Sequence, residues 1–317
     1  MPWGFNYDHD RDGRLIEDYW HEEWETVRED FAEMQALGAN VVRVHLQLGR
    51  FMETPERPNA RNLARLADLL ALAEETGLRL DLTGLGCYHK ADVPAWYDPL
   101  PEADRWAVQG RFWSAVAETC AQSPAVFCYD LMNEPLVAGA PREDWLGGGF
   151  AGKHFVQFLT LDPNGRSRGE IAREWIRAMT AAIREHDADT PITVGLIAHP
   201  PQNPGAFSGI TPEIAVAELD YVCVHLYPET GKPDEALAML AGFDRGKPVV
   251  IEETFPLKCS PEELETFLDR SAERADGWIG FYWGATPEEL AERDDLGAAL
   301  TAAWLDLFRQ GPPPRPE

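Results

Sequence analysis

Short apolar runs alternate with helical patterns along the whole of this 317-residue chain. Each apolar run has the length of one buried strand, and each helical pattern spans several turns. About eight strand-helix units are present, which is the number that a closed parallel barrel requires. The sequence therefore predicts the α/β class and a single (β/α)8 TIM barrel over residues 1–317. The predicted strands are residues 3–7, 41–45, 78–83, 125–129, 192–196, 221–227, 247–255 and 278–283.

One connection is much longer than the others. Residues 136–168 follow the fourth strand, show no firm periodicity and contain several aromatic side chains. A long connection inside a compact domain usually carries function. We therefore expect an active-site loop insertion over residues 136–168, and a frayed tail over the proline-rich residues 311–317. The predicted helices are residues 24–37, 63–75, 105–119, 170–185, 212–218, 234–240, 261–274 and 296–308.

The fourth predicted strand ends in an amide and a carboxylate. The apolar run 125–129 leads into Asn133, Glu134 and Pro135, and the proline prevents the strand from continuing. In parallel α/β folds, ligands bind beyond the carboxyl ends of the strands. Asn133 and Glu134 are therefore candidate site residues, although a solvated turn after the strand would have the same sequence.

A second predicted strand also ends in acid, because the run 247–255 contains Glu252 and Glu253. Two strand-terminal glutamates on one rim suit hydrolysis of a glycosidic bond. One carboxyl protonates the leaving oxygen, and the other attacks the sugar or activates water. Neighbouring strand residues point to opposite faces, but strand alternation alone does not decide which of the two glutamates enters the barrel.

The charge of the chain restricts its partners. The formal net charge is −26 at pH 7, from 54 acidic and 28 basic residues. Such a surface repels nucleic acids and anionic membranes, so a neutral or cationic substrate is expected. The N-terminus lacks a signal-peptide pattern and no apolar run is long enough to span a membrane. The sequence as written predicts a cytoplasmic protein, or a secreted one if a leader has been removed.

Further residues occur in the order found in a known enzyme family. Arg43 lies in the second predicted strand, His225 and Tyr227 lie in the sixth, and Trp283 ends the eighth. Together with the two glutamates, these residues give a sequence that resembles the retaining (β/α)8 glycosidases of clan A. It is most similar to glycoside hydrolase family 5, the cellulase and mannanase family. The likeness extends over nearly the whole chain.

The resemblance implies a role for each matching residue. Glu134 would be the acid/base and Glu253 the nucleophile, while Asn133 would hold the sugar 2-hydroxyl. Glu252 would then turn towards the helix layer or towards a neighbouring basic side chain. Arg43 would keep the nucleophile ionised, and Tyr227 would donate a hydrogen bond to it. The residues expected to support the two glutamates are Arg43, Asn133, His225 and Tyr227.

The sequence departs from the family pattern in two places. Family members usually carry a histidine at the end of the third strand, where this chain has Thr83 and Gly84. His89, in the following loop, could take that role, or the role is missing. The family nucleophile is usually followed by an aromatic residue and glycine, whereas Thr254 and Phe255 follow Glu253. The resemblance therefore predicts the reaction better than the substrate.

Sugar rings stack on indole faces, so aromatic side chains on the rim are candidate subsites. The scattered histidines and five cysteines lack metal-ligand spacing, and we expect neither a metal nor a cofactor. The residues predicted to bind substrate are Trp283, His89, Trp96 and Trp145.

The sequence thus predicts a retaining β-glycoside hydrolase that acts on neutral glucan- or mannan-type oligosaccharides or glycoconjugates. Two alternatives stay open. One is a galactosidase or mannosidase of another specificity within the same clan, and the other is a barrel that binds carbohydrate without catalysis. The sequence does not predict an oligomeric state.

Overall fold

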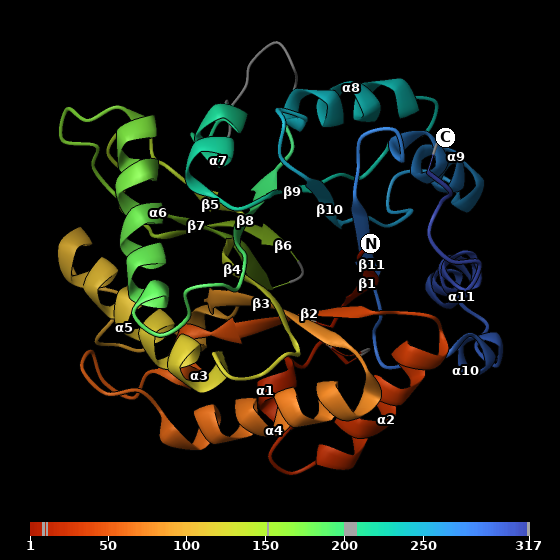
Figure 1. The fold of residues 1–317 in the computed structure, drawn as a ribbon, viewed down its shortest axis with the longest axis horizontal. Coiled ribbons are helices and arrows are strands. Elements are labelled where there is room, and N and C mark those ends of the chain that lie inside the picture. Colours follow the sequence, from red (N-terminus) through yellow and green to blue (C-terminus); the bar gives the residue numbers. More distant parts are fainter. Residues whose placement is uncertain (8–9, 11, 151, 200–207, 316–317) are drawn as a thin grey trace.

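Eight parallel strands close into a barrel at the centre of the structure, a computed structural model that describes all residues except 8–9, 11, 151, 200–207 and 316–317. The helices surround the strands, as Figure 1 shows. This arrangement confirms the predicted (β/α)8 TIM barrel, and each of the eight predicted strands is present. The barrel strands are β1 Trp3–Asn6, β2 Val41–Gln47, β3 Arg79–Gly86, β4 Val126–Asn133, β8 Ile192–Ile197, β9 Val222–His225, β10 Val249–Glu253 and β11 Gly277–Phe281.

Local sequence signals define the ends of the outer helices. Asn59 caps α4 by accepting hydrogen bonds from two backbone amides, and Gly77 ends that helix in the left-handed conformation. Ser260 and Glu263 form a capping box at the start of α9. The helices are α1 Ile16–Tyr19, α2 Trp24–Ala36, α3 Leu48–Phe51, α4 Ala60–Thr76, the 3₁₀ helix η1 Lys90–Asp92, α5 Glu102–Cys120, α6 Arg168–Arg184, α7 Pro212–Glu218, α8 Pro233–Phe243, α9 Pro261–Ser271, α10 Pro287–Ala291 and α11 Leu296–Phe308.

Strand alternation separates two environments. On β2, Val42 and Val44 belong to the large apolar cluster between the strands and the helices. Arg43 and His45 point the other way, into the barrel, and both are buried. A smaller apolar cluster of Val41, Cys128, Tyr221, Cys223, Val250 and Ile279 shares the inward face of its strands. The barrel interior is therefore apolar at one level and charged at the next, towards the strands' carboxyl ends.

The predicted loop insertion contains a small sheet of its own. Strands β5 Pro135–Leu136, β6 Leu146–Phe150 and β7 Lys153–Phe158 pair in the order β5-β7-β6, with β6 and β7 antiparallel. This sheet packs against the carboxyl-terminal part of the barrel through contacts with β4 and β8. The alternation of β6 and β7 was not recognised in the sequence because three glycines interrupt the first strand.

The proline-rich tail is partly packed. Pro313 is buried, and Arg315 pairs with Asp276 at 2.9 Å, so this stretch lies against the barrel. Residues 316–317 of the predicted frayed tail lie outside the described residues. Among the described residues, no helix combines the length and apolar character needed to cross a membrane.

Candidate active site

Arg43 connects four strands at the carboxyl end of the barrel. Its side chain is fully buried on β2. The guanidinium donates to Thr83 Oγ1 at 2.7 Å and to Asn6 Oδ1 at 2.9 Å, and it also reaches two residues of β4. Those two acceptors are Asp130 Oδ2 and Asn133 Oδ1, each at 2.9 Å. Because the buried guanidinium donates hydrogen bonds to several acceptors at once, it fixes their positions relative to one another.

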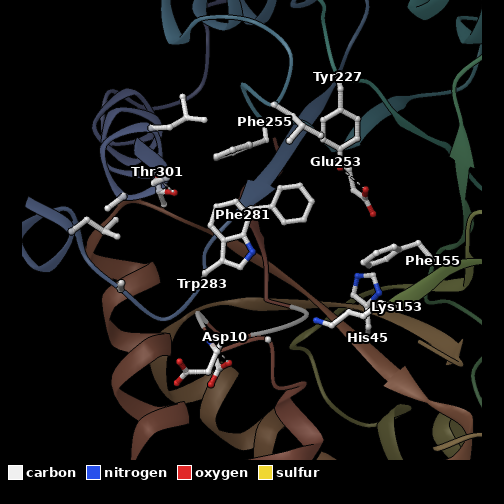
Figure 2. A pocket seen from close by; sticks show the side chains of 18 of the residues that line it. Asp10, His45, Lys153, Phe155, Tyr227, Glu253, Phe255, Phe281, Trp283 and Thr301 are labelled. Atoms are coloured by element: carbon white, nitrogen blue, oxygen red, sulfur yellow. Dashed lines mark hydrogen bonds between the residues drawn. The ribbon is translucent and has the colours of Figure 1, made fainter. Parts of the chain in front are cut away.

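Glu253 ends β10, and both of its oxygens are held. Arg43 Nη1 donates to Oε1 at 2.6 Å, and the Tyr227 hydroxyl donates to Oε2 at 2.7 Å. The carboxylate is only partly buried and faces the cavity (Figure 2). The predicted contacts of Arg43 and Tyr227 with this glutamate are therefore present.

Glu252 and its neighbour Glu253 both turn into the barrel, although neighbouring strand residues normally point to opposite faces. The pairing of β10 with β9 shifts register between Ile251 and Glu253, and such a bulge re-aims consecutive side chains. Glu252 is fully buried, 3.6 Å from the Arg43 guanidinium and 3.3 Å from His225 Nε2. The resemblance left Glu252 to turn either towards the helix layer or towards a basic side chain. In the structure it points towards the basic side chains of Arg43 and His225.

Glu134 follows β4 in an unusual backbone conformation. Its φ is +46°, in the left-handed region that non-glycine residues rarely occupy, which is typical of functional positions. Its amide donates to the carbonyl of Gly195 at 3.0 Å, and its Oε1 lies 2.9 Å from His225 Nδ1. One oxygen of Glu134 comes within 4.8 Å of an oxygen of Glu253.

His225 lies between three carboxylates. Burial alone would lower the pKa of its imidazole, but the charge of Glu253 and the hydrogen bonds with Glu134 and Glu252 raise it to about 10. The imidazole is therefore cationic at neutral pH, and both of its nitrogens can donate. It links the two glutamates that face the cavity to the buried Glu252.

A cluster of buried acids lies beneath this site. Burial raises the pKa of Asp81 well above its usual value, whereas it raises that of Asp130 to about 6 against the opposing effect of Arg43. Burial would likewise raise the pKa of Glu252, but Arg43 and His225 hold it at about 2. Two buried cations, Arg43 and His225, thus stabilise ionised Glu252, whereas burial favours the neutral form of Asp81.

Gly195 on β8 makes room for this cluster. A Cβ atom at this position would lie 2.9 Å from Glu252 Oε2 and 2.9 Å from His225 Nε2. Such contacts are too close for a rigid, fully packed charge cluster. The glycine therefore allows the glutamate and the imidazole to meet.

Glu134 and Glu253 both line a cavity of about 850 Å³, and Figure 2 shows Glu253 among the side chains around it. The inserted sheet forms one side with Gly148, Lys153, Phe155 and Val156, so this part of the predicted insertion does reach the site. Asn133 Nδ2 donates to the carbonyl of Phe155 at 2.9 Å and joins the sheet to β4. The active-site role of the insertion stays a prediction, but its position fits that role.

Of the four residues predicted to bind substrate, Trp283 lines the cavity and the other three do not. Trp145 is buried, with its indole donating to Asp98 O at 3.2 Å and Arg105 packed over its ring. Trp96 packs edge-on against Tyr97. His89 lies at a separate small depression beside η1. These positions speak against substrate binding by His89, Trp96 and Trp145.

The polar residues of the cavity that the sequence did not predict include His45 and Lys153. His45 lines it from β2, with Nδ1 hydrogen-bonded to the hydroxyl of Tyr88, and Lys153 reaches it from β7 (Figure 2). His45 lies two residues after Arg43 and so shares its inward face, a signal that strand alternation offers. His45, and not His89, therefore lines the cavity.

Among the residues that the structure describes, two groups of side chains have ligand atoms close enough to hold a cation. They are Glu134 with His225 and Glu253, and Asp81 with Asp130 and Glu252. In the first group the raised pKa of His225 keeps its nitrogens protonated, which opposes metal ligation. In the second group the Arg43 guanidinium already supplies the positive charge that balances Asp130 and Glu252.

Comparison with known families identifies the class to which this site belongs. The family described as cellulase (glycosyl hydrolase family 5) matches residues 6–287. The chain belongs to glycosyl hydrolase family 5, and it is a glycosidase of the (β/α)8 type. No curated protein sequence matches it.

Solved structures of low sequence identity share the fold. An exo-β-1,4-mannosidase from Opitutaceae bacterium strain TAV5 superposes with a TM-score of 0.70 at 19% identity, over 98% of this chain and 58% of that one. A GH5_18 protein from Streptomyces cattleya gives 0.67 at 17%, over 99% and 82%. A β-1,4-mannanase from the sea hare Aplysia kurodai gives 0.59 at 14%, over 96% and 88%. This chain thus spans little more than half the length of the first.

Proposed function

We propose that this protein is a retaining β-glycoside hydrolase in which Glu253 is the nucleophile and Glu134 the acid/base. The observation that carries the proposal is the meeting of these carboxylates across one cavity, with oxygens within 4.8 Å of each other. Retaining glycosidases hold their two carboxyls about 5–5.5 Å apart, whereas inverting enzymes leave room for a water at roughly 6.5–9.5 Å. The short separation therefore favours direct attack by one carboxylate.

The two steps use each glutamate differently. In the first, a Glu253 oxygen bonds to the anomeric carbon while the bond to the leaving oxygen breaks, and Glu134 gives that oxygen its proton. In the second, Glu134 removes a proton from water, the water oxygen bonds to the anomeric carbon, and Glu253 leaves as a carboxylate. Each inversion reverses the other, so the product keeps the configuration of the substrate.

The surrounding contacts suit this division of roles. Arg43 and Tyr227 hold the two oxygens of Glu253, so the attacking group is oriented before substrate arrives. His225 donates to one oxygen of Glu134 and leaves the other for the leaving group. Asn133 is fixed by Arg43 and by the carbonyl of Phe155, in a position suited to holding a sugar hydroxyl.

We propose neutral β-linked sugars of the mannan or glucan type as substrates, with β-mannosides to be tried first. The choice of mannosides follows two structural neighbours, an exo-β-1,4-mannosidase and a β-1,4-mannanase. The strong negative charge of the chain favours neutral substrates as well. A galactosidase specificity and a non-catalytic carbohydrate-binding barrel are the competing proposals.

A panel of aryl β-mannoside, glucoside, galactoside and xyloside, together with polymeric mannan and glucan, tests the function. Release of the aryl group or of reducing ends by the wild type, and its loss in Glu253→Ala, supports hydrolysis. Preference for the galactoside would favour the first alternative. Calorimetric binding of sugars without any release would establish the non-catalytic alternative and overturn the proposal.

A further inference from the structure

The cavity continues away from the glutamates along a mostly aliphatic and aromatic surface. We call this surface the apolar wall. Its side chains come from the segment after β10, from the end of β11 and the segment after it, and from α10 and α11. Figure 2 labels three of them, Phe255, Phe281 and Trp283. Its members are Phe255, Leu257, Phe281, Trp283, Leu290 and Leu300.

The apolar wall is partly open to solvent. Leu257 is 59% exposed, Phe281, Trp283 and Leu300 are half-buried, and Phe255 and Leu290 are buried. Leu257 is one of three large hydrophobic side chains that are exposed among the described residues. Exposed hydrophobic groups gathered at a cavity mark a binding surface.

The polar groups on the α10–α11 side of the cavity are engaged with one another. Arg293 pairs with Asp295 at 2.9 Å, and Asp295 Oδ1 accepts from the amide of Ala298 at 2.8 Å. The hydroxyl of Thr301 donates to the carbonyl of Gly297 at 2.8 Å. These contacts cap the start of α11 and use part of the hydrogen-bonding capacity of Arg293, Asp295 and Thr301.

A second sugar ring would be poorly served by such a surface. Its hydroxyls lose hydrogen bonds to water and need protein partners in return. Aromatic faces such as that of Trp283 can stack on a sugar, but Leu257, Leu290 and Leu300 offer neither stacking nor hydrogen bonds. A hydrocarbon chain meets no such cost and gains free energy as it leaves water.

We propose that the apolar wall binds the hydrocarbon aglycone of an amphiphilic β-glycoside, whose sugar lies at Glu134 and Glu253. This inference rests on the proposed hydrolase function and narrows its substrate class. The wall and the two glutamates line one continuous cavity, so a single molecule can occupy both. The substrate is then a sugar linked to an alkyl or acyl chain.

Chain length provides the test. Methyl, butyl and octyl β-glycosides of the sugar accepted in the aryl panel are hydrolysed below their micelle concentrations, and kcat/KM is measured. Burial of one methylene is worth about 0.8 kcal/mol, so kcat/KM should rise up to about fourfold per buried methylene, chiefly through KM. The same kcat/KM for all three glycosides would overturn the proposal.

Two variants on one helix locate the effect. Leu300→Ser alters the wall, whereas Leu296→Ser removes an exposed leucine of the same helix that does not line the cavity. The octyl-to-methyl ratio of kcat/KM should fall severalfold in Leu300→Ser and stay at the wild-type value in Leu296→Ser. Equal ratios in Leu300→Ser and the wild type would overturn the assignment to this wall.

Binding measurements separate this inference from the proposed function. If no glycoside is hydrolysed, titration calorimetry with octyl and methyl β-mannoside still reports on the wall. Tighter binding of the octyl compound that weakens in Leu300→Ser supports the wall while the hydrolase proposal fails. Equal binding of the two compounds would overturn the assignment of the wall to a hydrocarbon chain. A dimer in sedimentation that Leu257→Ser and Leu300→Ser convert to monomer would overturn the same assignment.

Discussion

The glutamate end of the cavity and the apolar wall are supplied by different parts of the barrel. At the glutamate end, charged side chains come from the ends of strands and are joined by hydrogen bonds between 2.6 and 2.9 Å, with Arg43 at the centre. The apolar wall comes from the segments after the last two strands and from α10 and α11, and its leucines make no such bonds. One end is held in place by hydrogen bonds, and the other offers an apolar surface.

This difference predicts how substitutions divide between kcat and KM. Changes at the glutamate end disturb groups that act on the reacting atoms, so they should lower kcat. Changes in the wall remove contacts that are equal in the ground state and the transition state, so they should raise KM. The predictions that follow challenge this division, beginning with the largest expected effect.

Glu253→Ala should lower kcat by roughly 10⁴- to 10⁶-fold, because it removes the group that forms the covalent intermediate. Azide should restore turnover of an aryl β-glycoside by entering the vacated space, with an α-glycosyl azide as product. Mass spectrometry and proton NMR identify that product.

Glu252→Ala is the matched control for the azide experiment. Glu252 does not line the cavity, and its loss leaves Arg43 and His225 short of a buried counter-charge. Breaking a buried ion pair in this way costs about 3–5 kcal/mol of folding stability, which a urea melt would show. Azide rescue of Glu252→Ala but not of Glu253→Ala would reverse the two roles.

Tyr227→Phe should lower kcat by about 10²-fold, since it removes one of the two donors that orient Glu253. KM should change little, because the hydroxyl is directed at the carboxylate. Steady-state kinetics, with circular dichroism to check the fold, measure both effects. A normal kcat with a raised KM would place Tyr227 with the wall residues instead.

Trp283→Ala should raise KM by up to about tenfold, because an aromatic contact contributes about 0.5–1.5 kcal/mol beyond its buried area. Trp96→Ala provides the comparison, since Trp96 does not line the cavity and packs on Tyr97. Its KM should match the wild type. The reverse result would show that the loop after β3 binds substrate.

Glu252→Gln should lower the pKa of His225 from about 10 towards its ordinary 6.5. The reason is that an anionic oxygen 3.3 Å from Nε2 is lost, which destabilises the charged imidazolium and favours its deprotonation. Nitrogen-15 NMR titration of the histidines measures the shift. Glu265→Gln, on the exposed face of α9, is the control and should leave the titration of His225 unchanged. An unaltered pKa of His225 in Glu252→Gln would show that Glu252 does not act on the imidazole.

The strands and the loops also differ in how far the sequence predicts them. Short apolar runs located every barrel strand, and period-two alternation placed His225 and Tyr227 on one face, because the strand backbone fixes where a side chain points. Alternation left the direction of Arg43 open, and only the resemblance to family 5 assigned it to the site. With Arg43 placed, the same rule would have found His45. It did not predict that Glu252 and Glu253 both turn inward, because the bulge in β10 depends on the pairing with β9.

No comparable rule predicts from the sequence where a loop side chain points. Trp96 and Trp145 were assigned to the substrate from residue type alone, yet Trp145 is buried against Arg105 and Trp96 packs on its neighbour. The apolar wall was not predicted at all. The wall forms where the segment after β10 and helix α11, which are distant in sequence, line the same cavity. No local sequence pattern predicts that these two segments come together.

The configuration of the first product tests the central proposal most directly, because it depends on whether Glu253 bonds to the sugar. Proton NMR of the reaction on a β-glycoside, followed from the first minutes before the anomers equilibrate, distinguishes the two outcomes. Double displacement by Glu253 and Glu134 predicts that the β-anomer appears first and the α-anomer only later, by mutarotation. Initial release of the α-anomer would mean a single displacement by water and would contradict the assignment of Glu253 as the nucleophile.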